Sequence, residues 1–297
     1  MNTAKDISFS YFPGCSAMSA NRAYDISARS VADALGMGLV ELDDWNCCGA
    51  TAYVSISEKR SFVLSARNLA LAEKTGKDVV AICNACYLVL RKTNKYMAEN
   101  PKLRGEIAKA LAAGGMSYGG GVKVRHFLDV VVTDLGEEAV RRCVKRPLAG
   151  LKVAPYYGCQ IGRPFAEIDD AEDPQMMDRL IGWLGAEATK FPLKAKCCGG
   201  LMMTTQAEIG RELTGKVLKN AIDGGADCVA TACPLCQMNL EAYQAAVSKA
   251  MGTDCQIPVL YFTQLMGAAF GLSSDDLALK DSFTPVEAVL AEKVQSS

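Results

Sequence analysis

The sequence predicts an α/β fold of two pseudo-repeated β/α domains, each with a short parallel sheet and with cysteines at the C-terminal ends of its strands. Three observations support this prediction. Short apolar strands alternate with helical segments along the 297 residues, the predicted strands run into cysteines, and the cysteine pattern of the first half recurs in the second. We expect an N-terminal domain over residues 1–145 and a C-terminal domain over residues 146–297.

The repeat is clearest around two pairs of adjacent cysteines, Cys47-Cys48 and Cys197-Cys198. Each pair is followed, after 34 intervening residues, by a C-x-x-C motif, Cys83-x-x-Cys86 or Cys233-x-x-Cys236. The offset between the two copies is 150 residues, far longer than the roughly 20 to 50 residues of a solenoid repeat. The duplicated unit is therefore a whole domain.

In the first half, apolar runs predict strands over residues 7–12, 39–42, 78–82 and 122–127. Helical segments are predicted over residues 22–35, from the Ser55 cap to about residue 74 and from residue 86 to about 97, and a further helix is predicted after residue 101. The Pro13-Gly14 turn delivers Cys15 at the end of the first strand, and Ser55-x-x-Glu58 has the form of a capping box for the second helix.

The second half repeats this order, with strands predicted over residues 152–157, 186–191, 228–232 and 259–262. The first of these strands leads to Gly158-Cys159. Asp173-Pro174 predicts the start of a helix to about Leu184, and Thr205-x-x-Glu208 repeats the capping box. Residues 137–151 have the charge, proline and glycine content of a linker. Parallel sheets place ligand sites at the C-terminal ends of their strands, where these cysteines are expected.

Composition restricts the class of protein. Half of the residues are apolar, so the chain can bury a large core, and 13 cysteines without a small secreted scaffold suggest metal binding in a reducing compartment. The formal net charge of −1 gives no basic surplus for nucleic acid. The start, Met1–Asp6, has no apolar signal-peptide region, and no run approaches the roughly 18 apolar residues of a membrane span. We expect a cytoplasmic protein whose partner is another protein or a small molecule.

Each half supplies five thiols in this pattern. A structural zinc site closes at four ligands, and an ordinary cubane iron–sulfur cluster also takes four. Either one cysteine per half stays free for redox chemistry, or each half holds an unusual cluster with an additional thiolate. Zinc remains the alternative that an iron and sulfide assay would decide.

Four features of the sequence carry a family resemblance: the duplicated cysteine spacing, Val124-Arg125-His126-Phe127, Tyr157-Gly158-Cys159 and Cys233-Pro234-x-Cys236. Together they resemble the duplicated CCG domain of the B subunits of heterodisulfide reductases. The resemblance spans nearly the whole chain. It implies two noncubane [4Fe-4S] clusters, one per half. The ligands that it implies are ten cysteines: Cys15, Cys47, Cys48, Cys83, Cys86, Cys159, Cys197, Cys198, Cys233 and Cys236.

The resemblance also implies an activity, the two-electron reductive cleavage of a disulfide between the two clusters. The substrate is the disulfide of coenzyme M and coenzyme B or a related thiol or sulfur compound. Members of the family from methanogens carry histidine after the second Gly-Cys, where this sequence has Gln160, so the methanogen substrate does not transfer directly. The alternative is an electron-relay protein without a disulfide substrate, as in complexes associated with succinate dehydrogenase.

The chain lacks the clustered cysteine run of ferredoxin-type clusters, so its electrons must come from a partner. The resemblance implies two partners: a ferredoxin-like iron–sulfur protein, the C-type component of such complexes, and a flavin-containing protein, the A-type component. A cavity open to solvent between the two cysteine sets would favour the enzyme, and a buried site without a cavity would favour the relay.

His126 is the only histidine of the chain and a candidate proton donor to a departing thiolate. The alternative is a strand-end histidine that is hydrogen-bonded for packing. Three cysteines outside the pattern are expected to be free or buried: Cys143, Cys228 and Cys255. Lys194, Lys196 and Arg163 could meet an anionic substrate or serve as solvated surface charges.

Overall fold

The computed structural model describes residues 7–294, with side chains through residue 291. It contains two four-stranded sheets, with strand orders β2-β1-β3-β4 and β6-β5-β7-β8, and all the pairings are parallel. The strands are β1 (Ser8–Phe12), β2 (Gly38–Glu41), β3 (Val79–Ala81), β4 (Val124–His126), β5 (Lys152–Tyr156), β6 (Glu187–Ala188), β7 (Cys228–Thr231) and β8 (Val259–Tyr261). The predicted α/β fold with a repeated unit is confirmed. Met1–Asp6, where no signal peptide is predicted, lies outside the described residues.

Helices connect the parallel strands in both halves. The first half contains α1 (Arg22–Ala34), α2 (Ala52–Ile56), α3 (Glu58–Thr75), α4 (Asn84–Glu99), α5 (Pro101–Ala113), α6 (Phe127–Asp129), the π-helical turn η1 (Val130–Leu135) and α7 (Gly136–Cys143). The second contains α8 (Met176–Trp183), α9 (Met202–Thr205), α10 (Ala207–Asp223), α11 (Pro234–Ala242), α12 (Gln244–Met251), α13 (Phe262–Ala269), the 3-10 turn η2 (Leu279–Asp281) and α14 (Val286–Val294). Among the described residues, no helix is long and apolar enough to cross a membrane.

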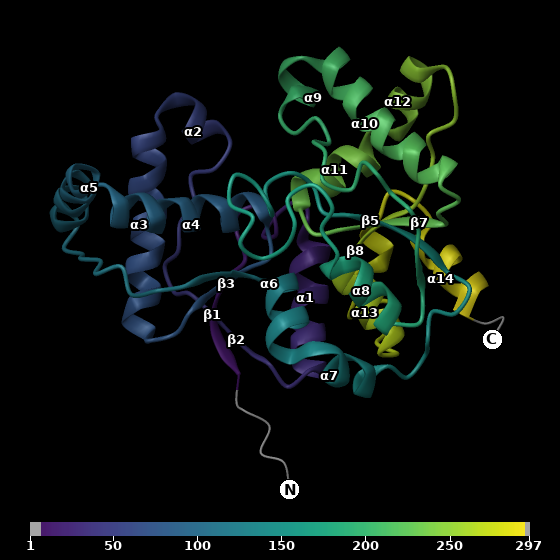
Figure 1. Cartoon of the computed structure of the whole chain (residues 1–297), viewed down its shortest axis with the longest axis horizontal. Helices are drawn as coiled ribbons and strands as arrows, with labels where there is room; N and C mark the ends of the chain where they lie inside the picture. Colours follow the sequence, from purple (N-terminus) through teal and green to yellow (C-terminus); the bar gives the residue numbers. More distant parts are fainter. Residues whose placement is uncertain (1–6, 295–297) are drawn as a thin grey trace, which may run out of the picture.

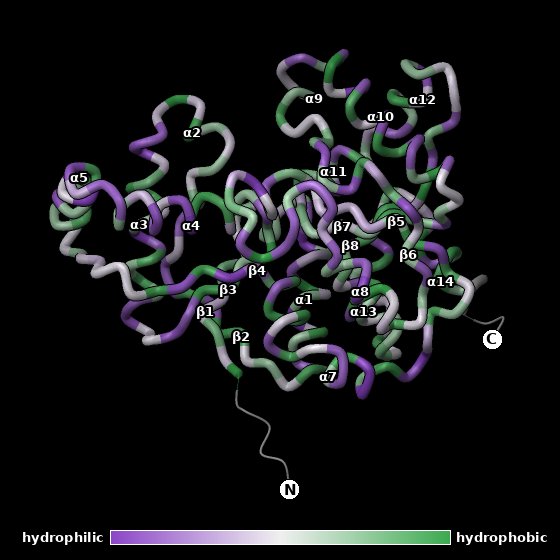
Figure 2. The backbone as a smooth tube through the Cα atoms, viewed as in Figure 1, coloured by the Kyte–Doolittle hydropathy of each residue, from purple (hydrophilic) through white to green (hydrophobic). Residues whose placement is uncertain are grey.

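The two halves lie side by side and share their hydrophobic cores. Figure 1 shows α3, α4 and α5 on one side of the molecule, α9 to α12 on the other, and α1, α8 and α13 between them. The outer helices alternate between hydrophilic and hydrophobic residues along their length (Figure 2), as expected for helices that bury one face. Both main clusters of buried apolar side chains contain residues of both sheets. The halves therefore form one packed body.

Helices α1 and α13 make the contact at the centre of this interface. The rings of Tyr24 and Tyr261 stack with their centroids 4.1 Å apart and their planes 8° from parallel. The Ser27 and Thr263 hydroxyls are hydrogen-bonded at 2.7 Å. Asn21, at the start of α1, donates from Nδ2 to the Tyr261 hydroxyl at 2.8 Å. These buried hydrogen bonds join one half to the other and thereby fix the register of the two halves.

Both predicted capping boxes are wrong. Ser55 lies inside α2, and Ser57 caps α3 by accepting a hydrogen bond from the Arg60 amide. In the second half, Thr205 lies inside α9, and α10 starts after Gln206, which makes no capping side-chain bond. The physical reason is the same in both halves. A short extra helix follows each cysteine pair and takes up the residues that were predicted to cap the long helix.

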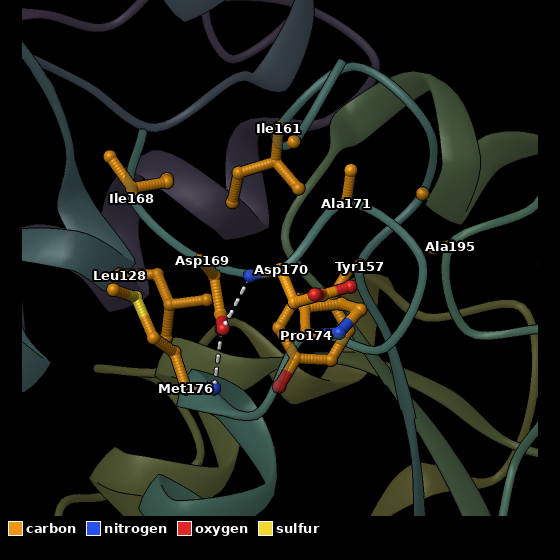
Figure 3. A pocket seen from close by; sticks show the side chains of 12 residues that line it. Leu128, Tyr157, Ile161, Ile168, Asp169, Asp170, Ala171, Pro174, Met176 and Ala195 are labelled. Atoms are coloured by element: carbon orange, nitrogen blue, oxygen red, sulfur yellow. Dashed lines mark hydrogen bonds between the residues drawn. The ribbon is translucent and has the colours of Figure 1, made fainter. Parts of the chain in front are cut away.

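The prediction that Asp173-Pro174 starts a helix is also wrong, because α8 starts at Met176. Asp169 takes over the capping role. Its Oδ2 accepts hydrogen bonds from the Gln175 amide at 2.8 Å and from the Met176 amide at 2.7 Å. Figure 3 shows the bond to Met176. The adjoining cavity in this view measures about 10 Å³, which is room for about one water molecule. This cavity is left by the packing of the loop, and it is too small to hold a substrate.

The expected linker is folded. Helix α7 occupies its first part and buries Val140, and Leu148 and Leu151 are also fully buried. Clustered charge on the exposed face of α7 produced the linker composition. The boundary that we propose between residues 145 and 146 falls between α7 and β5. Helix α4 starts at Asn84, two residues earlier than predicted, so the first C-x-x-C motif lies in its first turn.

Candidate functional site

All ten patterned cysteines follow the C-terminal ends of strands. In each half, the single cysteine follows the first strand, the adjacent pair follows the second, and the C-x-x-C motif follows the third. Cys83 and Cys233 occupy the N-caps of α4 and α11, so their side chains stand at the junction of a strand and a helix. The predicted gathering of cysteines at the strand ends agrees with these positions.

The thiols of each half form a continuous line of neighbours. The Cys15 and Cys47 sulfur atoms lie 3.9 Å apart, and the Cys48 and Cys86 sulfur atoms lie 3.2 Å apart. The matching Cys198–Cys236 distance in the second half is 3.5 Å. The remaining neighbours in each line influence each other's pKa: Cys47 and Cys48, Cys83 and Cys86, Cys159 and Cys197, Cys197 and Cys198, and Cys233 and Cys236.

The two lines meet at Cys83 and Cys233. These two thiols interact across the interface between the halves, since each shifts the pKa of the other. Both are buried, whereas Cys15 and Cys197 are exposed to solvent. The ten thiols therefore form one unbroken row that is buried in the middle and reaches the surface in each half.

Hydrogen bonding separates the thiols into thiolate-like and thiol-like members. A bond from Cys15 lowers the pKa of Cys47 to about 2, and a bond from Cys159 lowers the pKa of Cys197 to about 2. The donors respond in the opposite direction, since the bond with Cys47 raises the pKa of Cys15. Because thiolates are the form of cysteine that binds metal, Cys47 and Cys197 are prepared for ligation in the same way in both halves.

Two glycines allow the backbone to pass beside the row of thiols. Gly14 has a φ of +79° and Gly158 a φ of +72°, values that side chains disfavour. A Cβ at Gly14 would lie 3.0 Å from the Cys86 sulfur, and a Cβ at Gly158 would lie 3.0 Å from the Cys236 sulfur. The glycine before each single cysteine is thus required by both conformation and space.

Two cavities lie against the thiols. One of about 140 Å³ is lined by all five thiols of the first half, and one of about 320 Å³ by all five of the second. Thr51, Leu201 and Leu235 line both cavities, so the two are neighbours that share a wall. Thr51 has a φ of +63°, a rare conformation for a β-branched residue. Such strain is often found at binding sites.

Each half also contributes to the cavity of the other. Leu201, Pro234 and Leu235 of the second half line the first cavity, and Asn84 lines the second. Asn84 donates from Nδ2 to the Tyr157 carbonyl at 2.7 Å, and its buried Oδ1 has no hydrogen-bond partner among the described residues. Gln160 lines the second cavity as well. Sequence reasoning missed Asn84, although its place inside the C-x-x-C motif could have indicated it.

His126 lies away from both cavities. It is fully buried at the end of β4, and its Nδ1 accepts a hydrogen bond from the Leu128 amide at 3.2 Å. Burial lowers its pKa to about 4, although the carbonyls of Ile82 and Ala232 favour the charged form. His126 therefore stays neutral near pH 7, between the strands that deliver Cys83 and Cys233. This position supports the packing role more than proton donation.

The other residues considered from the sequence serve local structure. Cys228 and Cys255 are buried, and the half-buried Cys143 donates to the Ala34 carbonyl at 3.3 Å. The charged residues are paired: Lys194 with Asp173 and Asp178, and Lys196 and Arg163 with Glu172. None of these side chains lines either thiol cavity.

The donor set fits iron–sulfur clusters. Each cavity presents five thiols, and thiolates are the ligands that iron–sulfur clusters take. The described residues contain no group of three or more His, Cys, Asp or Glu side chains placed around one metal ion. The thiols are spread along a row instead. Such a row suits a cluster whose several irons each take a thiolate.

Comparisons with known proteins agree with this site. The family model described as "Cysteine-rich domain" (CCG) matches residues 9–91 and 153–241. The membrane anchor of the 8-methylmenaquinol:fumarate reductase of Wolinella succinogenes is 33% identical over 91% of this chain and 95% of its own length. The B subunit of a ferredoxin/F420H2-dependent CoB-CoM heterodisulfide reductase of Methanosarcina acetivorans is 31% identical over 92% of both chains.

A solved structure supports the fold alone. A hypothetical protein from Helicobacter pylori superposes with a TM-score of 0.75 at 18% identity, over 94% of this chain and 52% of its own. The chain thus spans about half of that structure. Because the CCG model matches both halves and relatives named as B subunits of heterodisulfide reductases align along almost the whole chain, the protein belongs to the heterodisulfide reductase B-subunit family, with the CCG cysteine-rich domain present twice.

Proposed function

We propose that this chain is the iron–sulfur catalytic subunit of a heterodisulfide reductase-like complex of the cytoplasm. The ten cysteines of the row hold two [4Fe-4S] clusters of the noncubane type, one in each half. The substrate is a small disulfide, either the mixed disulfide of coenzyme M and coenzyme B or a related thiol or sulfur compound. The reaction adds two electrons and two protons to one disulfide and releases two thiols.

The observation that carries this proposal is the pair of adjoining cavities. Each cavity is lined by one set of five thiols, and Thr51, Leu201 and Leu235 border both. A disulfide placed at the shared wall would present one sulfur atom to each thiol set. A relay protein would need the same cavities to hold its clusters, so the support for the enzyme comes from the shared wall, where one small substrate would meet both thiol sets.

When bound, the clusters would supply one-electron steps at two neighbouring sites. The residues of the chain would bind and orient the substrate. Thr51, Leu201 and Leu235 position the disulfide, and Gln160 and the Asn84 side chain offer polar contacts on the second side only. Protons for the leaving thiolates come from solvent through the cavities. In this proposal His126 positions the strands that deliver Cys83 and Cys233, and its role as proton donor is the alternative.

Electrons must reach the chain from partners. Relatives of this chain are named as subunits of complexes that use ferredoxin. We therefore propose the ferredoxin-like iron–sulfur protein of the C type as the direct donor and the flavin-containing protein of the A type behind it. An electron-relay function remains the second candidate, because one relative is the membrane anchor of a fumarate reductase.

Filling the shared wall separates the two candidates. Leu201→Trp should block disulfide reduction by the reduced complex while the iron content and the reduction of the chain by its electron donor stay unchanged. The matched control is Ile209→Trp, because Ile209 is similarly exposed, 42% against 40% for Leu201, and lines neither cavity. Full disulfide turnover by Leu201→Trp would contradict the placement of the disulfide at the shared wall, whereas absence of turnover by the unmodified complex, with both clusters present and reduced by the donor, would support the relay.

A further inference from the structure

The two thiol sites share one architecture but differ at several buried positions of the helix that follows each C-x-x-C motif, and in the second half one of these side chains contacts the adjacent cysteine pair. Val89 on α4 and Asn239 on α11 are the third residues after the last cysteine of each motif and lie 150 residues apart. Both are buried, at 4% and 2% exposure. An apolar side chain in one half therefore corresponds to an amide in the other.

The Asn239 amide points at the adjacent cysteine pair. Its Nδ2 lies 2.9 Å from the Gly200 carbonyl oxygen, 3.4 Å from the Cys198 carbonyl oxygen and 3.6 Å from the Cys198 sulfur. The Gly200 amide also donates to that sulfur at 3.5 Å. Cys198 thus accepts a side-chain N–H bond in addition to a backbone one.

The first half lacks this side-chain donor. The amides of Ala50 and Gly200 each favour the thiolate of the neighbouring Cys48 or Cys198, but among the described residues only the Gly200 amide makes a hydrogen bond to the sulfur, at 3.5 Å. Among the described residues, the side-chain partners of the Cys48 sulfur are thiols: Cys86 and the neighbouring Cys47. Val89 has no N–H to offer. Asn239 therefore gives the Cys198 sulfur a side-chain N–H donor that the Cys48 sulfur lacks.

An N–H bond to a ligating sulfur favours the reduced state of an iron–sulfur cluster. Reduction adds negative charge that spreads onto the sulfur ligands, and a donor that stabilises this charge raises the reduction potential. Among the described residues, the charged ones near the two cysteine pairs give neither site an unpaired charge that would shift its potential, because Lys196 is paired with Glu172 and Asp44 is paired with Arg67. The second cavity is larger and is also lined by Gln160, and its polarity should likewise raise the reduction potential of the C-terminal site.

We infer that Asn239 makes the C-terminal site the one of higher reduction potential, so that electrons given to the chain reside first beside Cys198. This inference rests on the proposed function, because it requires an iron–sulfur cluster in each half. It assigns the two sites unequal roles. The N-terminal site passes electrons on, and the C-terminal site holds the first electron until the second arrives.

The test is a potentiometric titration, followed by electron paramagnetic resonance, of the anaerobically purified chain with its clusters. The unmodified chain should show two separate midpoint potentials. Asn239→Val, which copies the first half, should lower the higher potential and leave the lower one in place. The reciprocal Val89→Asn should raise the lower potential.

Thr214→Val is the matched control. Thr214 supports the same loop by donating from Oγ1 to the Cys198 carbonyl at 2.8 Å, but it does not touch the sulfur. Its substitution should loosen the loop and leave both potentials unchanged. An equal shift in Thr214→Val and Asn239→Val would overturn the inference, because loop support would then explain both.

Iron and sulfide analysis keeps the two proposals apart. Fewer than two clusters in the unmodified chain would contradict the proposed function. Two clusters with coincident potentials, or an unshifted potential in Asn239→Val, would overturn only the inference about Asn239. If Asn239→Val loses the C-terminal cluster, Val89→Asn decides, and an unshifted lower potential in that variant would overturn it.

Discussion

Cys83 and Cys233, each the first cysteine of a C-x-x-C motif, lie close enough across the interface between the two halves for each thiol to shift the pKa of the other. This contact joins two rows of five thiols into one row of ten. It also makes the proposed cluster sites direct neighbours, with Thr51, Leu201 and Leu235 at the wall that their cavities share. A substrate at the shared wall of the cavities would be within reach of both.

Removal of a central thiol should cost one cluster. Cys233→Ser should lower the iron content from about eight to about four atoms per chain, because a [4Fe-4S] cluster loses a ligand. Iron and acid-labile sulfide analysis measures this. Cys228→Ala is the control, since Cys228 is a buried strand cysteine outside the row and its loss should leave iron unchanged. Full iron content in Cys233→Ser would contradict the assignment of Cys233 as a ligand.

A side chain at Gly158 should displace the second site. The new Cβ of Gly158→Ala would lie 3.0 Å from the Cys236 sulfur, and the φ of +72° disfavours any side chain. We expect loss of iron from the second half and destabilisation by about 1–2 kcal/mol. By contrast, Gly105→Ala on α5 meets no atom within 4 Å and should stabilise the chain by about 0.5–1 kcal/mol. Retention of all iron by Gly158→Ala would argue against the close approach.

His126 should make stability depend on pH. Its pKa in the folded chain is lowered to about 4 by burial, whereas an unfolded histidine titrates near 6.5. As pH falls from 7 to 5, His126 becomes protonated in the unfolded chain but stays neutral in the folded chain. The free energy of unfolding therefore falls by about 2 kcal/mol. His126→Asn keeps a side-chain oxygen that can accept a hydrogen bond from the Leu128 amide. It should remove the part of the pH dependence of the free energy of unfolding that comes from His126.

Urea unfolding of both chains at pH 7 and pH 5 measures that difference. The other groups titrate equally in the two proteins, so the comparison isolates His126. Equal slopes would mean that the imidazole is protonated in the folded state, and the proton-donor role would then regain support. Disulfide turnover by His126→Asn at pH 7 should stay near that of the unmodified chain, since the packing role predicts no lost proton.

Relief of strain at Thr51 should stabilise the fold. Thr51→Gly removes a β-branched side chain from a φ of +63° and should raise the free energy of unfolding by about 1 kcal/mol, the strain less the added chain entropy. Leu201 is the equivalent residue of the second half and has an ordinary φ of −70°. Leu201→Gly should therefore destabilise. Loss of stability in Thr51→Gly as large as in Leu201→Gly would show that Thr51 is not strained.

The sequence predicted the strands and the positions of the cysteines well, because both depend on local patterns that recur after 150 residues. It misplaced the helix caps, since Ser55 and Ser57 are equally good capping residues until the short helix α2 is seen. The predicted linker failed for a similar reason, as the charged surface of α7 concealed the burial of Val140.

The contact between Cys83 and Cys233 could not be predicted, because no sequence pattern specifies how the two halves pack. The same holds for Asn84, whose side chain lines a cavity built mainly by the other half. Asn239 could be noticed as the partner of Val89 in the repeat, but its bond to the Cys198 sulfur required coordinates.

The reciprocal lining of the cavities gives the molecule the character of a dimer within one chain. Each half offers the same edge of its sheet to the other, as two identical protomers do in an isologous pair. Asn84 reaches into the second cavity just as Pro234 borders the first. Neither half would enclose a site alone, so a single copy of the repeat could have worked only by pairing with itself. Fusion of the copies then left positions such as 89 and 239 free to diverge.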